Sequence, residues 1–230
     1  MSSDFEDHCW KDLVDQEILE IYESYHRETF IGPNPALLVI DLYNRAYAGG
    51  PGPVAEANRK SPGACGDNAW NAITPTVQVI AAARKAGIPV AYCTGSVRDG
   101  RIQSTFRSET ERRPEADDLE IKQEFAPQPG DIVVRKERAS AFYGTPLSAQ
   151  LRMLGVQSLI AFGESTSGCV RASVVDGYSD GFKMTVAEEC TFDRSWLSHK
   201  VNLFDLHHKY ADVMHVEQIL AHLEELAAAR

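Results

Sequence analysis

Short apolar runs alternate with longer segments of helical periodicity along most of the chain. Nearly continuous apolar runs of this kind are typical of strands that helices cover on both faces of a parallel sheet. We therefore expect six strands, at residues 36–42, 89–95, 132–137, 158–163, 183–189 and 212–216.

Helical patterns separate most of these runs, at residues 70–88, 146–155, 169–181, 198–210 and 216–230. Strands that alternate with helices of this length imply right-handed βαβ units and a mostly parallel sheet. The pattern predicts one doubly wound α/β domain of about six strands over residues 35–230, after an N-terminal helical extension over residues 1–34. Within that extension we expect an amphipathic helix at residues 10–25, packed outside the core or against another subunit.

Two long stretches, residues 43–67 and 96–130, show no regular periodicity and are expected to be irregular. Each follows the carboxyl end of a predicted strand, which is where open α/β sheets bind ligands. Loops of this length are usually functional or mobile. A solvated connection explains the second stretch equally well, because it is heavily charged.

Composition excludes several classes of protein and partner. The 230 residues are 43% hydrophobic and 24% charged, which is ordinary for a globular protein and unlike collagenous, disordered or disulfide-dense chains. A net charge of −10 opposes binding to nucleic acid or anionic membranes, so we expect a small-molecule substrate. No apolar run is long enough to span a bilayer, and the acidic start lacks a signal-peptide pattern. These features predict a cytoplasmic protein.

One of the five cysteines has a suggestive position. Cys169 follows a strand and the loop GESTSG, and it begins a helical pattern. A thiol at a helix N-terminus is stabilised as thiolate, and the same backbone N–H groups can receive an oxyanion. The alternative is a small buried apolar residue. The remaining cysteines are scattered without a C-x-x-C pair and are interpreted as structural: Cys9, Cys65, Cys93 and Cys190.

Other candidate motifs are weak when taken singly. Asp41 and Lys136 each end a strand, and each is also explained as a turn residue or a solvated lysine. GESTSG lacks the Lys that a phosphate-binding loop requires next.

The histidines form no metal-binding motif, and we expect no metal site. His207 and His208 are expected on the surface of a helix. A Cys–His dyad of Cys169 with His199 or His215 stays open.

Taken together, these segments resemble the isochorismatase-like cysteine hydrolases. The resemblance rests on Asp41, Lys136 and Cys169 in that order, on K-x-x-x-S-A-F at residues 136–142, and on the motifs DLYNRAY, SGCVRAS and EECTFDR. Within that superfamily the chain is most similar to the N-carbamoylsarcosine and maleamate amidohydrolases.

The resemblance implies a role for each matching position. Cys169 would be the nucleophile, Asp41 the general base and acid, and Lys136 the cation that orients them. The bond between Glu164 and Ser165 would be cis, and the backbone N–H groups of Ser165 and Cys169 would form the oxyanion hole.

A further implied role concerns substrate binding. Arg194 aligns with an arginine that grips the substrate carboxylate, and a planar guanidinium suits bidentate binding of that group. The chain departs from the family pattern in two places. Related nicotinamidases have an Asp-x-His metal site where this chain has Asp99 without a histidine, so no metal or cofactor is expected. Glu164 occupies a position that is usually small or apolar, which predicts an altered pocket rim.

The expected activity is hydrolysis of a small linear amide or ureido compound that bears a carboxylate, with release of ammonia through a Cys169 acyl-enzyme. A biuret- or triuret-type substrate, or another ureido amide, is the alternative. From different classes, a noncatalytic binding module and a flavin or nucleotide carrier stay open. The resemblance also implies a homotetramer, for which the N-terminal helix is a candidate contact.

Overall fold

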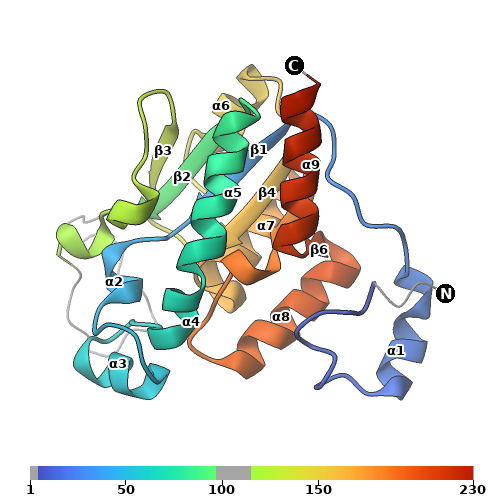
Figure 1. Ribbon diagram of the computed structural model, residues 1–230, viewed down its shortest axis with the longest axis horizontal. Helices are drawn as coiled ribbons and strands as arrows, with labels where there is room; N and C mark the ends of the chain where they lie inside the picture. Colours follow the sequence, from blue (N-terminus) through green and yellow to red (C-terminus); the bar gives the residue numbers. More distant parts are fainter. Residues whose placement is uncertain (1–4, 97–114, 230) are drawn as a thin grey trace.

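The sheet has six strands, all parallel, in the order β3-β2-β1-β4-β5-β6 (Figure 1). The computed structural model describes residues 5–96 and 115–229. The strands are β1 Pro35–Ile40, β2 Val90–Gly95, β3 Ile132–Lys136, β4 Ser158–Gly163, β5 Lys183–Ala187 and β6 Asp212–Met214. Chain order reverses beside β1, so the crevice between the carboxyl ends of β1 and β4 is the switch point where such folds bind ligands. The predicted doubly wound α/β domain is confirmed.

Helices cover both faces of this sheet. On one face, α5 (Ile73–Lys85) and α9 (Val216–Ala228) pack against Leu37 and Val39. The other face contacts α6, α7 and α8 through Leu38 and neighbouring side chains. These three helices span Leu147–Met153, Arg171–Ser179 and Trp196–Lys209.

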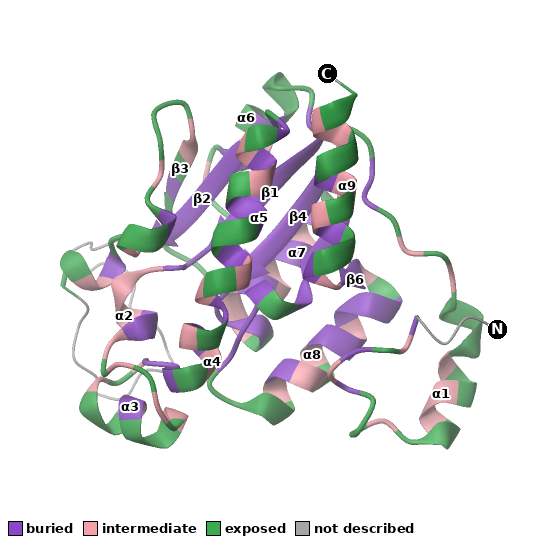
Figure 2. Cartoon of the chain, viewed as in Figure 1, coloured by how far each residue is buried: buried purple, intermediate pink, exposed green. Residues whose placement is uncertain are grey.

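The central strands are buried on both faces, as Figure 2 shows. All six residues of β1 and all six of β4 are buried. Alternate residues of β1 therefore belong to different halves of the core, and each fully buried aliphatic side chain contributes about 1.5–3 kcal/mol. This burial fixes the strand register, and with it the positions of the residues that follow each strand.

The first long stretch is not irregular as expected. It contains α2 (Asn44–Tyr47) and α3 (Val54–Lys60), and α4 (Gly66–Asn71) begins at its end. Helices of four to seven residues are too short to produce a clear 3.6-residue periodicity, which explains the wrong prediction.

The second long stretch is described only in part. Two short 3-10 helices, η2 (Asp117–Leu119) and η3 (Gln123–Phe125), lie within it. Asp99, noted above for having no neighbouring histidine, lies outside the described residues.

The N-terminal segment differs from the predicted amphipathic helix. Its helix α1 spans only Gln16–Tyr22, with Asp15 as N-cap, and a 3-10 turn η1 (Glu23–Tyr25) follows. Residues 5–13 form turns instead, and Trp10 is fully buried among the side chains of the core. The prediction of a helix from residue 10 outside the core is therefore wrong. Burial of the Trp10 side chain in the core stabilises the protein more than its exposure along a surface helix would.

Two histidines of α8 are also placed differently from the prediction. His207 and His208 are buried beneath the N-terminal segment, not exposed on a helix surface. The Nε2 atom of His208 lies 2.9 Å from Oε1 of Glu6, and Nδ1 of His207 accepts a hydrogen bond from the backbone of Val213. Nothing in the local pattern of α8 shows that another segment covers this face.

The described helices include none that is long and apolar enough to cross a membrane.

Candidate active site

Three candidate residues meet at the carboxyl edge of the sheet. Asp41 follows β1 directly, Lys136 ends β3, and Cys169 lies in a π-helical turn, Thr166–Val170, between β4 and α7. Strand β2 separates β1 from β3, so the long Lys136 side chain extends across its end. Its Nζ donates to Oδ2 of Asp41 at 2.7 Å and to Sγ of Cys169 at 3.3 Å. The structure thus brings the three predicted residues into one contact group.

The backbone of Asp41 adopts a left-handed conformation, with φ of 51°. Asp tolerates this region better than most residues. While Oδ2 accepts from Lys136, Oδ1 is buried without a hydrogen-bond partner among the described residues. This free acceptor is suited to take a proton from a neighbouring group.

Burial and mutual attraction set the protonation states of this group. Burial raises the pKa of Asp41, and the Lys136 ammonium offsets part of that increase. Although burial alone would lower it, the Asp41 carboxylate raises the pKa of Lys136. At neutral pH, Lys136 is therefore a cation that contacts both the Asp41 carboxylate and the Cys169 sulfur.

The thiol of Cys169 is less acidic than the sequence suggested. Burial and the Asp41 carboxylate raise the pKa of Cys169 to about 12, and Lys136 opposes them. The helix α7 begins only at Arg171, so Cys169 precedes it within the π turn instead of opening it. The expectation that Cys169 opens the helix is therefore wrong, and the raised pKa keeps the resting residue a thiol. The thiol needs a base during attack, and Asp41 is the adjacent one.

The peptide bond between Glu164 and Ser165 is cis, as the resemblance implied. The side chain of Glu164 is buried beside Arg194, and its effect on the pocket rim stays a prediction. Its Oε2 accepts from the Cys65 thiol at 3.4 Å and lies 3.6 Å from Nη1 of Arg194. Burial raises the pKa of Glu164, and Arg194 counteracts the increase. The predicted carboxylate-binding arginine is therefore already paired with an acid.

Hydrogen bonds accepted by Asp193 fix the turn that contains Cys169. Oδ2 of Asp193 accepts from the backbone and the hydroxyl of Ser167 at 2.9 and 2.7 Å, while Oδ1 accepts from the backbone N–H of Arg194 at 2.7 Å. Asp193 therefore connects the π-helical turn that contains Cys169 to the backbone of Arg194. Sequence reasoning missed both Asp193 and Cys65, although Asp193 lies inside the FDR segment that indicated Arg194.

Neither histidine proposed for a dyad contacts Cys169 in the part of the chain that the structure describes. Nδ1 of His199 lies 2.7 Å from Oγ1 of Thr166, and Nδ1 of His215 lies 2.6 Å from Oε1 of Glu189. A metal ion is also disfavoured beside Cys169, because the Lys136 ammonium already neutralises this position.

Comparison with known proteins places the chain among hydrolases. Residues 35–218 match the isochorismatase domain. The chain is 32% identical over 213 residues to an N-carbamoylsarcosine amidase of an Arthrobacter species, covering 88% of this chain and 76% of the relative. It is 44% identical over 102 residues to a maleamate amidohydrolase of Pseudomonas putida, covering 44% of this chain and 48% of the relative. The match thus spans about half the length of the maleamate enzyme.

The fold is shared with a solved structure of a cysteine hydrolase from Pseudomonas syringae. The two superpose with a TM-score of 0.72 at 19% identity, over 87% of this chain and 97% of the other. The family match and the amidase relative favour a hydrolytic enzyme over a noncatalytic binding module or a flavin or nucleotide carrier. The domain match covers most of the chain, and the protein is therefore a hydrolase that belongs to the isochorismatase family.

Proposed function

We propose that this protein hydrolyses a small linear amide or ureido compound and releases ammonia through an acyl-enzyme on Cys169. One observation carries the proposal: the Lys136 ammonium contacts both the buried Asp41 carboxylate and the Cys169 sulfur. A nucleophile, a base and an orienting cation are the parts that covalent amide hydrolysis requires. The names of the amidase relatives support the same reaction class.

The proposed reaction begins with proton transfer. Asp41 takes the thiol proton as Sγ of Cys169 attacks the amide carbonyl, and Lys136 stabilises the carboxylate before transfer and the thiolate that forms. Asp41 then returns the proton to the leaving nitrogen, which departs as ammonia. Water, deprotonated by Asp41, attacks the thioester or thiocarbamate and regenerates the thiol.

The developing oxyanion needs two donors near the carbonyl. We assign this role to the backbone N–H groups of Ser165, directly before the π-helical turn, and of Cys169, within it. Removing one such donor in other enzymes costs on the order of 10²–10³ in rate. Because these donors belong to the backbone, the hydrogen bonds from Ser167 to Asp193 that fix the turn also fix the oxyanion site.

The pair of Arg194 and Glu164 bears on the choice of substrate. Arg194 is 43% exposed, and its 3.6 Å contact with Glu164 leaves guanidinium donors available to bind a substrate carboxylate. The same pair favours a second candidate, an uncharged ureido compound of the biuret type. Glu164 would accept an N–H while Arg194 donates to a carbonyl, so the pair suits a group that carries both.

Ammonia release tests the proposal. N-carbamoylsarcosine, maleamate, ureidoacrylate and biuret should be compared with the wild type, Cys169→Ala and Asp41→Asn, each checked for folding by circular dichroism. Asp41→Asn suits the left-handed backbone position, because Asn also tolerates it. Acid-quenched wild type should show a mass adduct on Cys169 with its substrate. Unchanged ammonia release in Cys169→Ala would refute the mechanism.

We also propose a homotetramer, following the family resemblance. Light scattering coupled to size exclusion would give its mass directly. A monomer at micromolar concentration would refute this assembly without affecting the proposed chemistry.

A further inference from the structure

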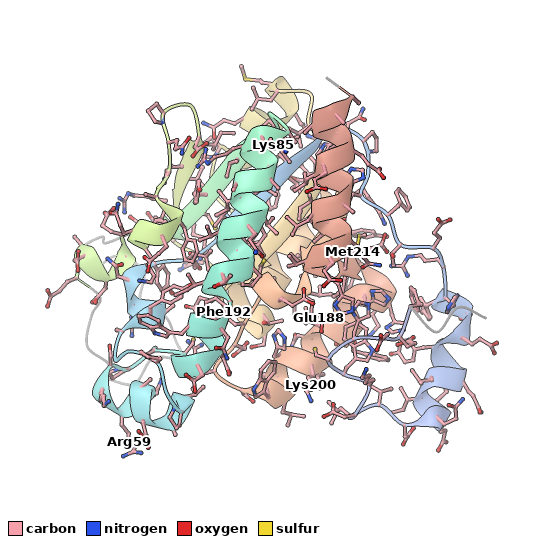
Figure 3. The ribbon with its side chains drawn as sticks, viewed as in Figure 1. Arg59, Lys85, Glu188, Phe192, Lys200 and Met214 are labelled. Carbon is pink, nitrogen blue, oxygen red and sulfur yellow. The ribbon has the colours of Figure 1, made fainter. Side chains whose placement is uncertain are left out.

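A second polar cluster lies on the same edge of the sheet, away from Cys169. Glu188 follows β5 at the start of the 3-10 turn Glu188–Cys190, and His215 follows β6. Figure 3 shows Glu188 in the same part of the molecule as Met214, the last residue of β6, and the two strands pair up to that point. His8 joins them from the N-terminal segment. Three distant parts of the sequence therefore meet where parallel sheets commonly bind ligands.

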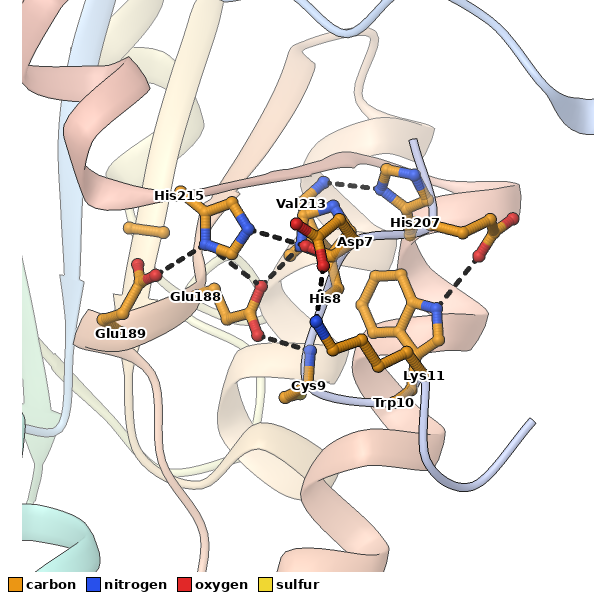
Figure 4. A network of polar contacts seen from close by, with 12 residues as sticks. Asp7, His8, Cys9, Trp10, Lys11, Glu188, Glu189, His207, Val213 and His215 are labelled. Carbon is orange, nitrogen blue, oxygen red and sulfur yellow. Dashed lines mark hydrogen bonds and ion pairs between the residues drawn. The ribbon is translucent and has the colours of Figure 1, made fainter. Parts of the chain in front are cut away.

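The donor atoms of these residues converge (Figure 4). Nδ1 of His8 lies 2.5 Å from Oε2 of Glu188, and Nδ1 of His215 lies 3.8 Å from the same oxygen. One ligand atom from each residue lies within 4.8 Å of the others. The two imidazole rings stack with centroids 4.8 Å apart and planes 23° apart, so both present a nitrogen to one carboxylate.

A cavity of about 860 Å³ opens beside this cluster. Glu188 and His215 line it together with three further acids, Asp7, Glu189 and Glu217. Among the described residues that line it there is no Lys or Arg. The ammonium of Lys11 is paired with Asp7, one of these acids, at 2.7 Å. A cation approaching through this cavity is therefore attracted by several carboxylates.

We propose that His8, Glu188 and His215 bind one divalent transition-metal ion of the zinc class, with a fourth position open to the acidic cavity. Two imidazole nitrogens and a carboxylate oxygen are a donor set that Zn²⁺ accepts at about 2.0–2.2 Å, with a water at the fourth position. Binding replaces the hydrogen bond between His8 and Glu188, and the proton of that bond leaves to solvent. The N–O separation then widens from 2.5 Å to about 3.3 Å, the spacing of tetrahedral ligands.

The site is separate from the proposed hydrolytic chemistry. None of Asp41, Lys136 or Cys169 lines this cavity. Sequence motifs could not indicate it, because His8 and Glu188 are 180 positions apart and the usual short metal-binding spacings are missing. A bound ion would join the N-terminal segment to the ends of β5 and β6.

The competing explanation is a plain hydrogen-bond network. His8 already contacts Glu188, and His215 lies 2.6 Å from Oε1 of Glu189 and 2.7 Å from the carbonyl of Asp7. Such a network would hold the N-terminal segment against the ends of β5 and β6 without a metal ion. The two explanations differ in metal stoichiometry, in the spectrum of bound metal and in the response of thermal stability to metal.

The test uses the full chain without an affinity tag, stripped with a chelator and then titrated with Co²⁺ or dialysed against Zn²⁺. We expect one Zn²⁺ per chain by elemental analysis, visible absorption bands of four-coordinate Co²⁺, and a higher melting temperature with Zn²⁺. His215→Asn keeps a good N-cap for α9 but removes the imidazole. It should weaken binding at least about tenfold, as loss of a zinc ligand or its support does.

His222→Asn on the same helix is the matched control, and it should bind the ion as the wild type does. Glu188→Gln should lose binding and the effect of Zn²⁺ on melting, with circular dichroism checking its fold. No retained metal in the wild type, or equal affinity in wild type and His215→Asn, would overturn the site and leave the hydrogen-bond network.

Discussion

Nη1 of Arg194 lies 3.6 Å from Oε2 of Glu164, and the Glu164 side chain is only 4% exposed. A buried acid beside the predicted substrate-binding arginine reduces the positive field that a substrate carboxylate would meet. The contact is too long for a bidentate pair, so it does not use up the donors of Arg194. The selectivity of the site therefore depends on both residues.

Replacing Glu164 tests this relationship. In Glu164→Gln, Arg194 loses its acidic partner but keeps a polar neighbour of the same size. We expect KM for an amide that bears a carboxylate to fall about tenfold, equivalent to about 1.4 kcal/mol. KM for biuret should not fall. Steady-state ammonia release with both substrates measures the change.

Cys65→Ser is the control for that experiment. It keeps a donor to Oε2 of Glu164 and leaves the pair with Arg194 intact, so its selectivity should match the wild type. A ratio of kcat/KM for the two substrates that is the same in Glu164→Gln and wild type would contradict the proposed role of Glu164.

Lys136 should act through the ionisation of Asp41. In Lys136→Met the buried cation is lost, and its lowering effect on the pKa of Asp41 disappears. The carboxylate then becomes protonated at higher pH, so the acid limb of the kcat/KM profile should move upward. Activity at neutral pH should fall on the order of 10²–10⁴-fold, the usual contribution of a positioned base.

Lys136→Arg separates charge from geometry. It keeps the cation, so its acid limb should stay near that of the wild type even if kcat falls. An acid limb in Lys136→Met at the wild-type position would show that Lys136 does not control Asp41.

Much of the fold is predictable because it depends on local patterns. The strand at Ser158–Gly163 agrees with its predicted bounds, because a continuous apolar run ends there at a glycine. Asp41, Lys136 and Cys169 could be placed at one edge because parallel strands present their carboxyl ends together. The predicted strand at residues 183–189 was too long, since a 3-10 turn begins at Glu188.

The remaining features depend on contacts between distant segments. Trp10 is buried because residues 5–13 pack over α8, and no periodicity within that segment encodes its partner. The partnership of Glu164 with Arg194 and Cys65 likewise joins three segments. The burial of Glu164 and the charges around it could be known only after the fold had brought these three segments together.

Gly163 should be essential for the pairing of β4 with β1. It pairs with Ile40 at the end of the strands and has φ of +127°, which L side chains rarely adopt. A Cβ atom there would overlap the carbonyl oxygen of Ile40. Gly163→Ala should therefore cost more than about 4 kcal/mol of stability or abolish folding. Urea unfolding measures the loss.

Gly155→Ala is the matched control for Gly163→Ala. Gly155 also has a positive φ, of +72°, but no heavy atom lies within 4 Å of its added Cβ. Only the left-handed conformation then costs energy, about 1–2 kcal/mol. Equal destabilisation by the two substitutions would contradict the proposed steric role of Gly163.

His207 should make the protein sensitive to mild acid. Burial and the neighbouring His8 and His208 lower the pKa of His207 to about 2, whereas the unfolded chain titrates near the ordinary pKa of 6.5. Below that pH the unfolded state binds a proton that the folded state does not. Stability should therefore fall with decreasing pH, by about 1.4 kcal/mol per unit for each such histidine.

The variant His207→Asn isolates this effect. Its side-chain oxygen can take the place of Nδ1 and accept from the backbone N–H of Val213, but it does not titrate. Absolute stability should fall because ring contacts with Phe5 and Trp10 are lost. The slope of stability against pH between about 6 and 4 should become shallower by one proton. Urea unfolding at several pH values measures that slope, and an unchanged slope in His207→Asn would show that His207 is not the group responsible.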